Sequence, residues 1–277
     1  MEILKFTLCG KTAFFKKPDV NNYVYYTFGH IHKVALLGLI GAVLGYDGYQ
    51  KQAIEKLYSK PSNKDNKNVN CDSENSCYPE FYKKLKDLKI GVVPVSDNGI
   101  FPKRIQQFNN TTCFASIGSK YGQNLIVTEQ WLENPAWDIY IILNCDEAEN
   151  IKNSLCGNKT YYTPYLGTND HMACIQNVQT LTDEKVKPLE SDKEKTTVNI
   201  CSLFQTNIGI IKNTSDDDDQ QNDIDLYKYE EYLPVGLDDK NNLYTYEKFT
   251  CTNMPVEVEK KNCGCLYKCE DKIIAFY

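Results

Sequence analysis

Apolar and polar residues alternate along Ile3–Cys9, and this period of two predicts a β-strand that the turn at Gly10–Thr12 ends. A second strand is predicted over Lys89–Val95, after a short helix over Pro79–Leu88 that has proline at its start. The apolar run Trp137–Leu143 predicts a third strand. Because strands and helices are interspersed, the pattern indicates an α+β fold with helices packed against one sheet.

The longest helical pattern covers Ile31–Gly45. Its small residues recur at spacings of three and four, beside Gly41, and share one face: Ala35, Gly38, Ala42 and Gly45. A glycine inside a helix costs about 1 kcal/mol relative to alanine. We therefore expect a sheet to approach the helix backbone closely along this face.

Turn signals separate short β-prone stretches between residues 96 and 123, and they predict a protruding hairpin there. These signals are Asp97–Gly99, Asn109–Asn110 and Gly118. The next segment, Glu129–Pro135, is predicted to be a short helical turn that proline stops.

Residues beyond about 160 are β-prone and are separated by acidic, polar linkers. We predict a core domain of residues 1–160, with the hairpin near 96–123, and a smaller β-rich part of residues 161–277. The β-prone segments are Met172–Thr180, Asn199–Ile211, Leu243–Thr252 and Ile273–Tyr277. Two polar stretches are predicted to be loops: Lys60–Cys77 and the like-charged run Asp216–Asp219, for which a divalent-metal site is the alternative.

Length and composition narrow the class of protein. The 277 residues are 42% hydrophobic, which is enough to fill a sizeable core. The longest apolar stretch, Val34–Leu44, is far shorter than the about 20 residues that span a bilayer. The first residues show no basic stretch before an apolar run, so we expect no secretory leader. These features predict a soluble cytoplasmic protein with no membrane partner.

The 12 cysteines are scattered, which suits free thiols in a reducing compartment better than a disulfide framework. The closest groups, Cys263–Cys269 and the pair Cys71 and Cys77, lack the paired spacing of a structural zinc site. Gly10–Thr12 suggests a phosphate-binding P-loop, but Lys5 stands where that loop needs its first glycine. We therefore expect no metal and no cofactor.

The net charge of −6 argues at first against a nucleic-acid partner, because phosphate binding depends on lysine and arginine. The charge is nevertheless uneven along the chain. Residues 1–60 hold eight lysines against four acidic residues, whereas residues 180–240 hold fifteen acidic residues against seven lysines. A polyanion should therefore bind the N-terminal half.

One candidate RNA-binding segment is Gly10–Lys17. A single-stranded RNA surface needs cations for phosphates and an aromatic ring on which a base can stack. The segment supplies both, with three lysines around two rings: Lys11, Lys16, Lys17, Phe14 and Phe15. The alternative is that one or both phenylalanines belong to the core.

His30 and His32 flank Ile31 at the start of the predicted helix. On a strand they would share a face and could bind a metal together with His171, whereas in a helix they point about 200° apart. We favour a phosphate site formed by these side chains and Lys33, because the N-terminus of a helix attracts anions. A purely structural role is the alternative.

Arg104 is the single arginine among the 31 lysine and arginine residues, and it lies in the predicted hairpin. Since lysine is the usual cation of this chain, an arginine here indicates a use for its forked donors on a phosphate or a base edge. Neighbouring side chains add a cation, amides and a ring that can read or stack bases: Lys103, Gln106, Gln107, Phe108 and Asn109. Chance is the alternative, because one residue is a small sample.

Five segments carry a family resemblance: Phe6–Pro18 (FTLCGKTAFFKKP), His32–Gly45 (HKVALLGLIGAVLG), Asn134–Pro135, Thr163–Gly167 (TPYLG) and Tyr232–Val235 (YLPV). Together they resemble the Cas five family of CRISPR Cascade subunits, within the RAMP superfamily, and specifically its type I-B form. The resemblance covers most of the chain and is patchy after residue 180.

The resemblance implies a ferredoxin-like, RRM-type domain with a protruding thumb hairpin and a smaller β-rich C-terminal part. It also implies a non-catalytic role in antiviral defence, in which core sheet and thumb bind and cap the five-prime handle of a crRNA. The implied partners are the Cascade backbone subunit and the large subunit, with target DNA reached indirectly through the complex. By position, Gly10–Lys17, the helix start near Lys33 and Lys103–Asn109 would line the handle.

The alternative function is a metal-independent endoribonuclease that processes the crRNA precursor. The type I-C relative of the family cuts its own crRNA with Tyr, Lys and His, for which this chain offers Tyr25, Tyr26, His30, His32 and Lys33. A downstream Lys–His pair resembling that relative's is missing, and in type I-B systems a separate subunit normally cuts. We therefore expect no catalysis.

Overall fold

The computed structural model describes residues 1–19, 23–58, 78–109, 125–190, 193–212 and 225–277. The fold is mixed α/β, with antiparallel sheets and few helices. The predicted loops Lys60–Cys77 and Asp216–Asp219 lie outside the described residues. In the ranges just given, no helix combines the length and apolar character needed to cross a membrane.

A four-stranded sheet with the order β3-β6-β1-β7 forms the centre of the molecule. Its strands are β1 (Ile3–Cys9), β3 (Ile90–Pro94), β6 (Ala136–Ile142) and β7 (Cys174–Leu181). The first three confirm the predicted strands to within a residue, and β7 overlaps the predicted Met172–Thr180.

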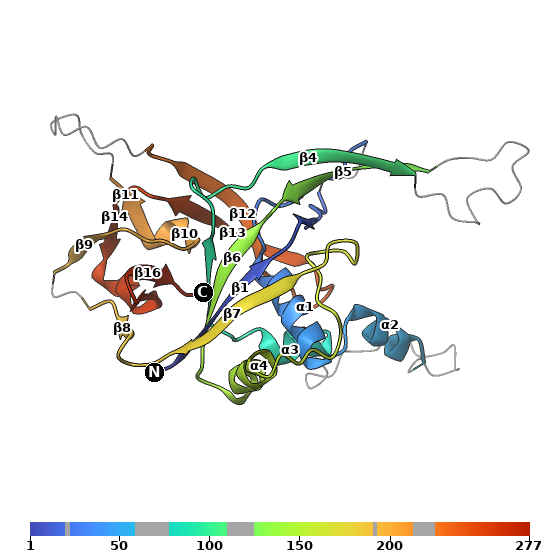
Figure 1. Ribbon diagram of the computed structural model, residues 1–277, viewed down its shortest axis with the longest axis horizontal. Helices are drawn as coiled ribbons and strands as arrows, with labels where there is room; N and C mark the ends of the chain where they lie inside the picture. Colours follow the sequence, from blue (N-terminus) through green and yellow to red (C-terminus); the bar gives the residue numbers. More distant parts are fainter. Residues whose placement is uncertain (20–22, 59–77, 110–124, 191–192, 213–224) are drawn as a thin grey trace, which may run out of the picture.

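The two faces of this sheet bury different sets of side chains, because successive residues of a strand point to opposite faces. Trp137 and Ile139 of β6 pack in the core that the helices cover, whereas Tyr140 and Ile142 pack in a second core with Phe276. The helices of the first face are α1 (Lys33–Leu44), α3 (Glu80–Leu85) and α4 (Asp146–Cys156), and α2 (Tyr49–Tyr58) lies to their side (Figure 1).

Helix α1 confirms the predicted helix, but the neighbour of its small-residue face is not the sheet. A Cβ added at Gly41 would lie 2.5 Å from Cβ of Phe81 in α3, and one added at Gly45 would lie 2.7 Å from the ring of Tyr161. Gly45 ends the helix with a φ of 81°, a conformation that favours glycine. The prediction of a close sheet is therefore wrong, since larger residues on the other sides of α1 fill the main core.

The remaining strands form small sheets on the other side of the central sheet and around α1 (Figure 1). Their sheet orders are β10-β13-β12, β11-β14-β9 and β16-β15-β8. The bounds are β8 (Val186–Pro188), β9 (Lys195–Val198), β10 (Phe204–Gln205), η1 (Thr206–Ile208), β11 (Gly209–Ile211), β12 (Lys228–Leu237), β13 (Tyr244–Thr252), β14 (Val256–Glu259), η2 (Lys260–Cys265), β15 (Leu266–Cys269) and β16 (Lys272–Ala275).

The two parts of the chain on either side of residue 160 share their cores. Strand β7 completes the central sheet by pairing with β1, although it follows residue 160. Leu233 of β12 and Phe249 of β13 belong to the same buried cluster as Phe6 and Leu37. The predicted boundary between residues 160 and 161 thus divides a sheet and a core.

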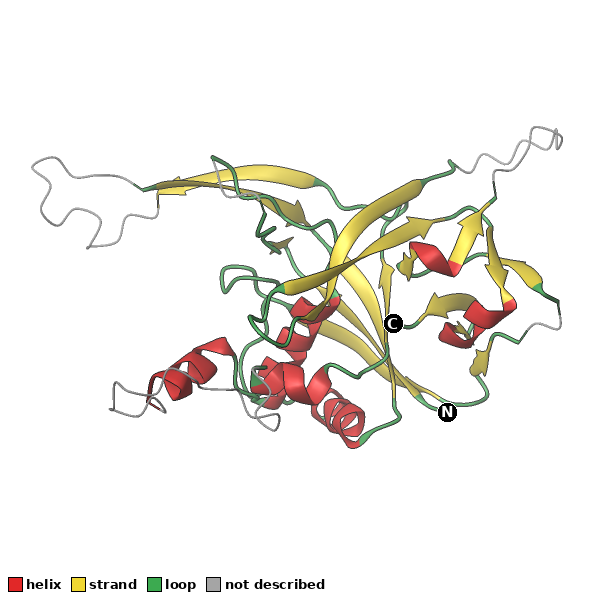
Figure 2. Ribbon diagram, turned by 180° about the vertical axis from the view of Figure 1, so that it is seen from behind, coloured by secondary structure: helices red, strands yellow, loops and turns green. Residues whose placement is uncertain are grey.

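A long hairpin extends from the body of the molecule (Figure 2). It is formed by β4 (Lys103–Asn109) and β5 (Ile126–Glu133), and the short strand β2 (Thr12–Ala13) pairs with β5 at its base. Residues 110–124, between the two strands, lie outside the described residues. The prediction of a helical turn at Glu129–Pro135 is wrong: most of that segment is the second hairpin strand, so the hairpin reaches past the predicted limit at residue 123.

Candidate nucleic-acid interface

The segment Gly10–Lys17 crosses the base of the hairpin and is held there by backbone hydrogen bonds. Thr12 and Ala13 pair with Glu133 and Leu132 of β5, and the amide of Phe14 donates to the carbonyl of Leu166 at 3.0 Å. This attachment fixes which side chains of the segment reach the surface.

Phe14 and Phe15 do not reach the surface. Both rings are buried, and the ring of Phe15 contacts the rings of His32 and Trp137. The prediction that Phe14 stacks on a base is therefore contradicted by its burial, and the alternative of a core residue holds for both rings. Lys11 and Lys16 are the exposed cations of the segment.

Lys17 is directed away from the exposed face. Its Nζ lies 2.6 Å from Oε1 of Glu231 in β12 and 5.2 Å from the centre of the Phe28 ring. Glu231 also accepts hydrogen bonds from the amide of Gly29 at 2.8 Å and the hydroxyl of Tyr229 at 2.7 Å. The charge of Lys17 is thus neutralised within the protein, contrary to the predicted phosphate contact.

His30 and His32 are interior residues, with 0% and 3% of their surfaces exposed. Nε1 of Trp137 donates to Nδ1 of His30 at 3.3 Å, and Nδ1 of His32 caps α1 by accepting from the amide of Ala35 at 3.2 Å. Burial lowers the pKa of His30 to about 4 and that of His32 to about 3, so both rings are neutral. Their predicted contact with RNA is wrong, and the structural alternative describes them.

Lys33, in the first turn of α1, is also mostly enclosed. Its Nζ donates to the backbone oxygen of Tyr277 at 3.2 Å. Burial lowers its pKa to about 8, with the nearby charge of Lys89 acting in the same direction. Lys33 therefore already has a hydrogen-bond partner within the protein, and its contact with a phosphate stays a prediction.

His171 lies near Phe14, with the centres of the two rings 6.4 Å apart. Its Nδ1 is 2.6 Å from the hydroxyl of Thr12, and its ring meets the ring of Trp131 edge to face at 4.6 Å. Burial lowers its pKa as well. Within the described ranges, no three His, Cys, Asp or Glu side chains are grouped to hold a metal ion.

The hairpin combines a cation with aromatic rings. Arg104 and Trp131 are opposite each other in the register of β4 and β5, and the guanidinium carbon lies 5.6 Å from the centre of the indole ring. Phe108 packs against the same indole at 6.3 Å. Arg104 also makes an ion pair with Glu133 at 3.4 Å, on the surface.

The other predicted hairpin residues lie on or near the exposed surface of β4. Lys103 and Gln107 are exposed, Gln106 is partly exposed, and Gln107 donates to the hydroxyl of Thr128 across the hairpin at 3.3 Å. Desolvation lowers the pKa of Lys103, and the nearby negative charge of Glu231 acts in the opposite direction. The structure thus brings Lys103–Phe108 together with Lys11 and Lys16 around the base of the hairpin.

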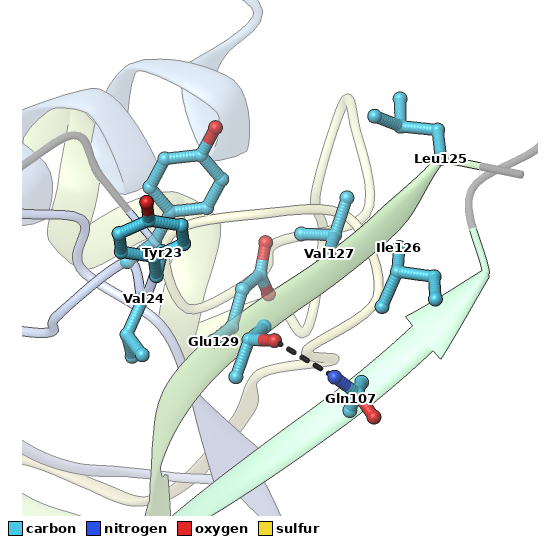
Figure 3. Close-up of a pocket in the computed structure, with 9 residues that line it drawn as sticks. Tyr23, Val24, Gln107, Leu125, Ile126, Val127 and Glu129 are labelled. Atoms are coloured by element: carbon cyan, nitrogen blue, oxygen red, sulfur yellow. Dashed lines mark hydrogen bonds between the residues drawn. The ribbon is translucent and has the colours of Figure 1, made fainter.

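An open hollow of about 940 Å³ lies between the hairpin and residues Tyr23–Tyr25. Figure 3 shows Tyr23 and Val24 on one side, residues of β5 on the other, and Gln107 reaching across from β4. Tyr23 is 95% exposed and Ile126 is 60% exposed. The hollow is also lined by the amide of Gln107 and the carboxylate of Glu129, and its exposed ring and apolar side chains can accept an unstacked base.

Tyr25 fixes the position of this hollow. Its amide donates to the carbonyl of Thr128 at 2.9 Å, and its carbonyl accepts from the amide of Gln130 at 2.9 Å. Nζ of Lys16 lies 3.8 Å from the centre of the Tyr25 ring. The sequence interpretation considered Tyr25 only as a nuclease residue and did not include Tyr23 or Trp131. The aromatic cluster Tyr23–Tyr26 could have indicated Tyr23, whereas Trp131 lies in the segment that was expected to be a helical turn.

No protein-family model matches the chain, and no curated protein matches it significantly. Among solved structures, a chain of a CRISPR RNA-guided surveillance complex aligns with a TM-score of 0.47 and 12% identity, over 94% of this chain and 92% of its own. A CRISPR protein from Archaeoglobus fulgidus aligns with a TM-score of 0.45 and 10% identity, over 99% of this chain and 98% of its own. A chain of a type III-B Cmr-beta complex bound to cognate target RNA and AMPPnP aligns with a TM-score of 0.43 and 11% identity, over 93% of this chain and 86% of its own. At these scores the likeness carries no conclusion about function.

Proposed function

We propose that the chain is a non-catalytic, RNA-binding subunit of a CRISPR effector complex, of the Cas five family and its type I-B form. In this proposal it caps the five-prime handle of a crRNA and contacts the backbone subunit and the large subunit of the complex. The observation that carries the proposal is the exposed group of cations and rings where the hairpin meets Lys11–Tyr26.

The order of elements supports the fold that the resemblance implies. Taken along the chain, β1, α1, β3, β6, α4 and β7 alternate as in a ferredoxin-like domain, and the sheet order β3-β6-β1-β7 fits that arrangement. The hairpin of β4 and β5 is inserted between β3 and β6 and is the proposed thumb.

The proposed contacts are limited to exposed or partly exposed side chains. Lysines and the single arginine would meet phosphates, amides would read base edges, and rings would stack. The revised set adds Tyr23, Tyr25 and Trp131 to the predicted residues. It omits the buried Phe14, His30 and His32, and also Gly10, Lys17 and Lys33. The set is then Lys11, Lys16, Lys103, Arg104, Gln106, Gln107, Phe108, Tyr23, Tyr25 and Trp131.

Replacing Arg104 by alanine should weaken binding of the chain's own repeat RNA about tenfold or more, because it removes a forked, charged donor. The RNA affinity of Arg104→Lys should lie between those of the unaltered protein and Arg104→Ala, since lysine keeps the positive charge but lacks the forked donors. The control is Lys187→Ala, an exposed lysine in β8, remote from the hairpin (Figure 1). Fluorescence anisotropy with labelled repeat RNA measures all four proteins.

Repeating the titration at several salt concentrations separates phosphate contacts from base contacts. Each lost phosphate contact should reduce the slope of log affinity against log salt by about 0.7 for single-stranded RNA. Equal affinity and equal slope for Arg104→Ala and Lys187→Ala would refute the thumb assignment. Failure of the unaltered protein to bind the RNA, even with its backbone subunit, would favour a protein-interaction module instead.

Incubation with the repeat RNA, with and without EDTA, should give no site-specific cleavage. The reason is the position of the candidate acid–base groups: His30 and His32 are buried and neutral, and Lys33 donates to Tyr277. Denaturing gel electrophoresis of end-labelled RNA checks this result. A discrete product that resists EDTA would establish the endoribonuclease alternative.

A further inference from the structure

Two cysteines face each other at one end of the central sheet. Cys9 is the last residue of β1, Cys174 is the first residue of β7, and the antiparallel register makes them direct partners. Direct partners in an antiparallel pair have Cα atoms about 4.5 to 5.5 Å apart, within the range of about 4.4 to 6.8 Å that a disulfide requires. The backbone therefore already has the spacing of a disulfide-bonded pair.

The thiols of this pair are free and in contact. Burial, the nearness of Cys174 and a hydrogen bond between the two side chains all raise the pKa of Cys9. Cys174 is exposed and Cys9 is half-buried, and the side-chain amide of Gln176 donates to Sγ of Cys174 at 3.1 Å. Solvent thus reaches the sulfur of Cys174 more readily than the half-buried sulfur of Cys9.

The backbone around the pair is already crowded and well attached. A Cβ added at Gly10, next to Cys9, would lie 2.9 Å from the carbonyl oxygen of Met172, two residues before Cys174. The amide of Gly10 donates to the carbonyl of Pro135 at 3.1 Å. Because the two strand ends are held together without the bond, little backbone movement is needed to form it.

The exposed cysteines near α4 provide a contrast. Cys145 precedes α4 and Cys156 is its last residue, so neither has a partner in a strand register. In the strand pairs that the structure describes, Cys9 and Cys174 are the one case of cysteine opposite cysteine.

We propose that Cys9 and Cys174 form a reversible disulfide when the protein meets a peroxide, a modification site that is independent of RNA binding. The Cys174 thiolate attacks one oxygen of hydrogen peroxide, the O–O bond breaks, and the released hydroxide takes up the thiol proton as water. The Cys9 thiolate then attacks the sulfur of the Cys174 sulfenic acid, and the S–S bond forms as hydroxide leaves and takes up the second proton. Two thiols are oxidised, and one peroxide is reduced to two waters.

The test is to treat the purified full-length protein with an equimolar amount of hydrogen peroxide, alkylate the remaining thiols, digest it and identify cross-linked peptides by mass spectrometry. The expected result is an intramolecular peptide pair that contains Cys9 and Cys174 and that dithiothreitol separates. The oxidised protein should also have a higher midpoint of thermal unfolding than the reduced protein, because the bond restricts the unfolded chain.

Two variants make the outcome decisive. Cys9→Ser should abolish the cross-linked pair and leave Cys174 as a sulfenic acid that dimedone labels, whereas Cys145→Ser should leave the pair unchanged. Cross-links between two molecules, or oxidation of Cys174 without a bond to Cys9 in the unaltered protein, would overturn the proposal.

Discussion

Replacing Glu231 by alanine should lower the free energy of unfolding by about 3 kcal/mol, because it leaves a cation and two hydrogen-bond donors without their acceptor. The Glu231 side chain is 9% exposed and Lys17, its ion-pair partner, is 28% exposed. The amide of Gly29 and the hydroxyl of Tyr229 lose the same carboxylate. Urea unfolding followed by circular dichroism measures the change.

The adjacent Glu230 supplies the matched control. It makes ion pairs with Lys228 and Lys248 on the surface, where such pairs contribute about 0 to 1 kcal/mol. The urea concentration at the unfolding midpoint of Glu230→Ala should therefore be nearly the same as that of the unaltered protein. If both variants lose a similar amount of free energy of unfolding, Glu231 contributes no more than a surface residue. The hydrogen bonds of its carboxylate to Gly29 and Tyr229 would then not stabilise the fold.

Replacing Gly167 by alanine should destabilise the protein by about 3 kcal/mol or force its loop to move. Gly167 has a φ of 96°, which non-glycine residues adopt at a cost of about 1 to 2 kcal/mol. An added Cβ would lie 1.8 Å from the carbonyl oxygen of Phe14, so the overlap adds to that cost. Thermal and urea unfolding both report the loss.

Gly264→Ala is the control for this substitution. Apart from its own helix and chain neighbours, no atom of the described residues lies within 4 Å of a Cβ placed at Gly264, which is exposed in η2. The control should change the free energy of unfolding by less than about 0.5 kcal/mol, as is usual for surface substitutions. If Gly167→Ala also changes the free energy of unfolding by less than this amount, the loop of Gly167 does not lie against the carbonyl of Phe14 as described.

Elements with a strong period were predictable from the sequence. Ile3–Cys9 and Lys33–Leu44 were found because alternation or helical spacing extends over them, and Ala136–Ile142 was found because it is an apolar run. Lys228–Leu237 was noticed only through its YLPV motif, since its more exposed first half is polar and its buried second half contains Pro234, a residue that is rare inside strands. The helix Asp146–Cys156 was missed, although its three buried residues, Ala148, Ile151 and Leu155, recur at helical spacings of three and four.

Strand β5 was misassigned for a physical reason. The sequence Glu129–Glu133 has acidic ends and a proline two residues later, which is also the composition of a short helix. Pairing with β4 over Lys103–Asn109 makes this segment a strand, and that pairing joins residues that are distant along the chain, from Asn109 with Ile126 to Lys103 with Leu132. Local propensity does not contain such information.

The candidate site was predicted in part. Lys11, Lys16 and the hairpin residues around Arg104 are at the surface, as a polyanion site requires. His30 and His32 were assigned to that site because the N-terminus of a helix attracts anions, but they fill the interior between α1, Trp137 and Tyr229. Burial depends on which segments fold over them, and β12 and β13 follow about 200 residues later.

The sharing of the central sheet between distant segments has a practical consequence. A truncated expression fragment that stops near residue 160 would lack β7, so the edge of β1 would be open for pairing with another chain. It would also lose Leu233 and Phe249, which close the apolar surface around α1. Such a fragment should aggregate, and the smallest unit for biochemistry is therefore the intact polypeptide.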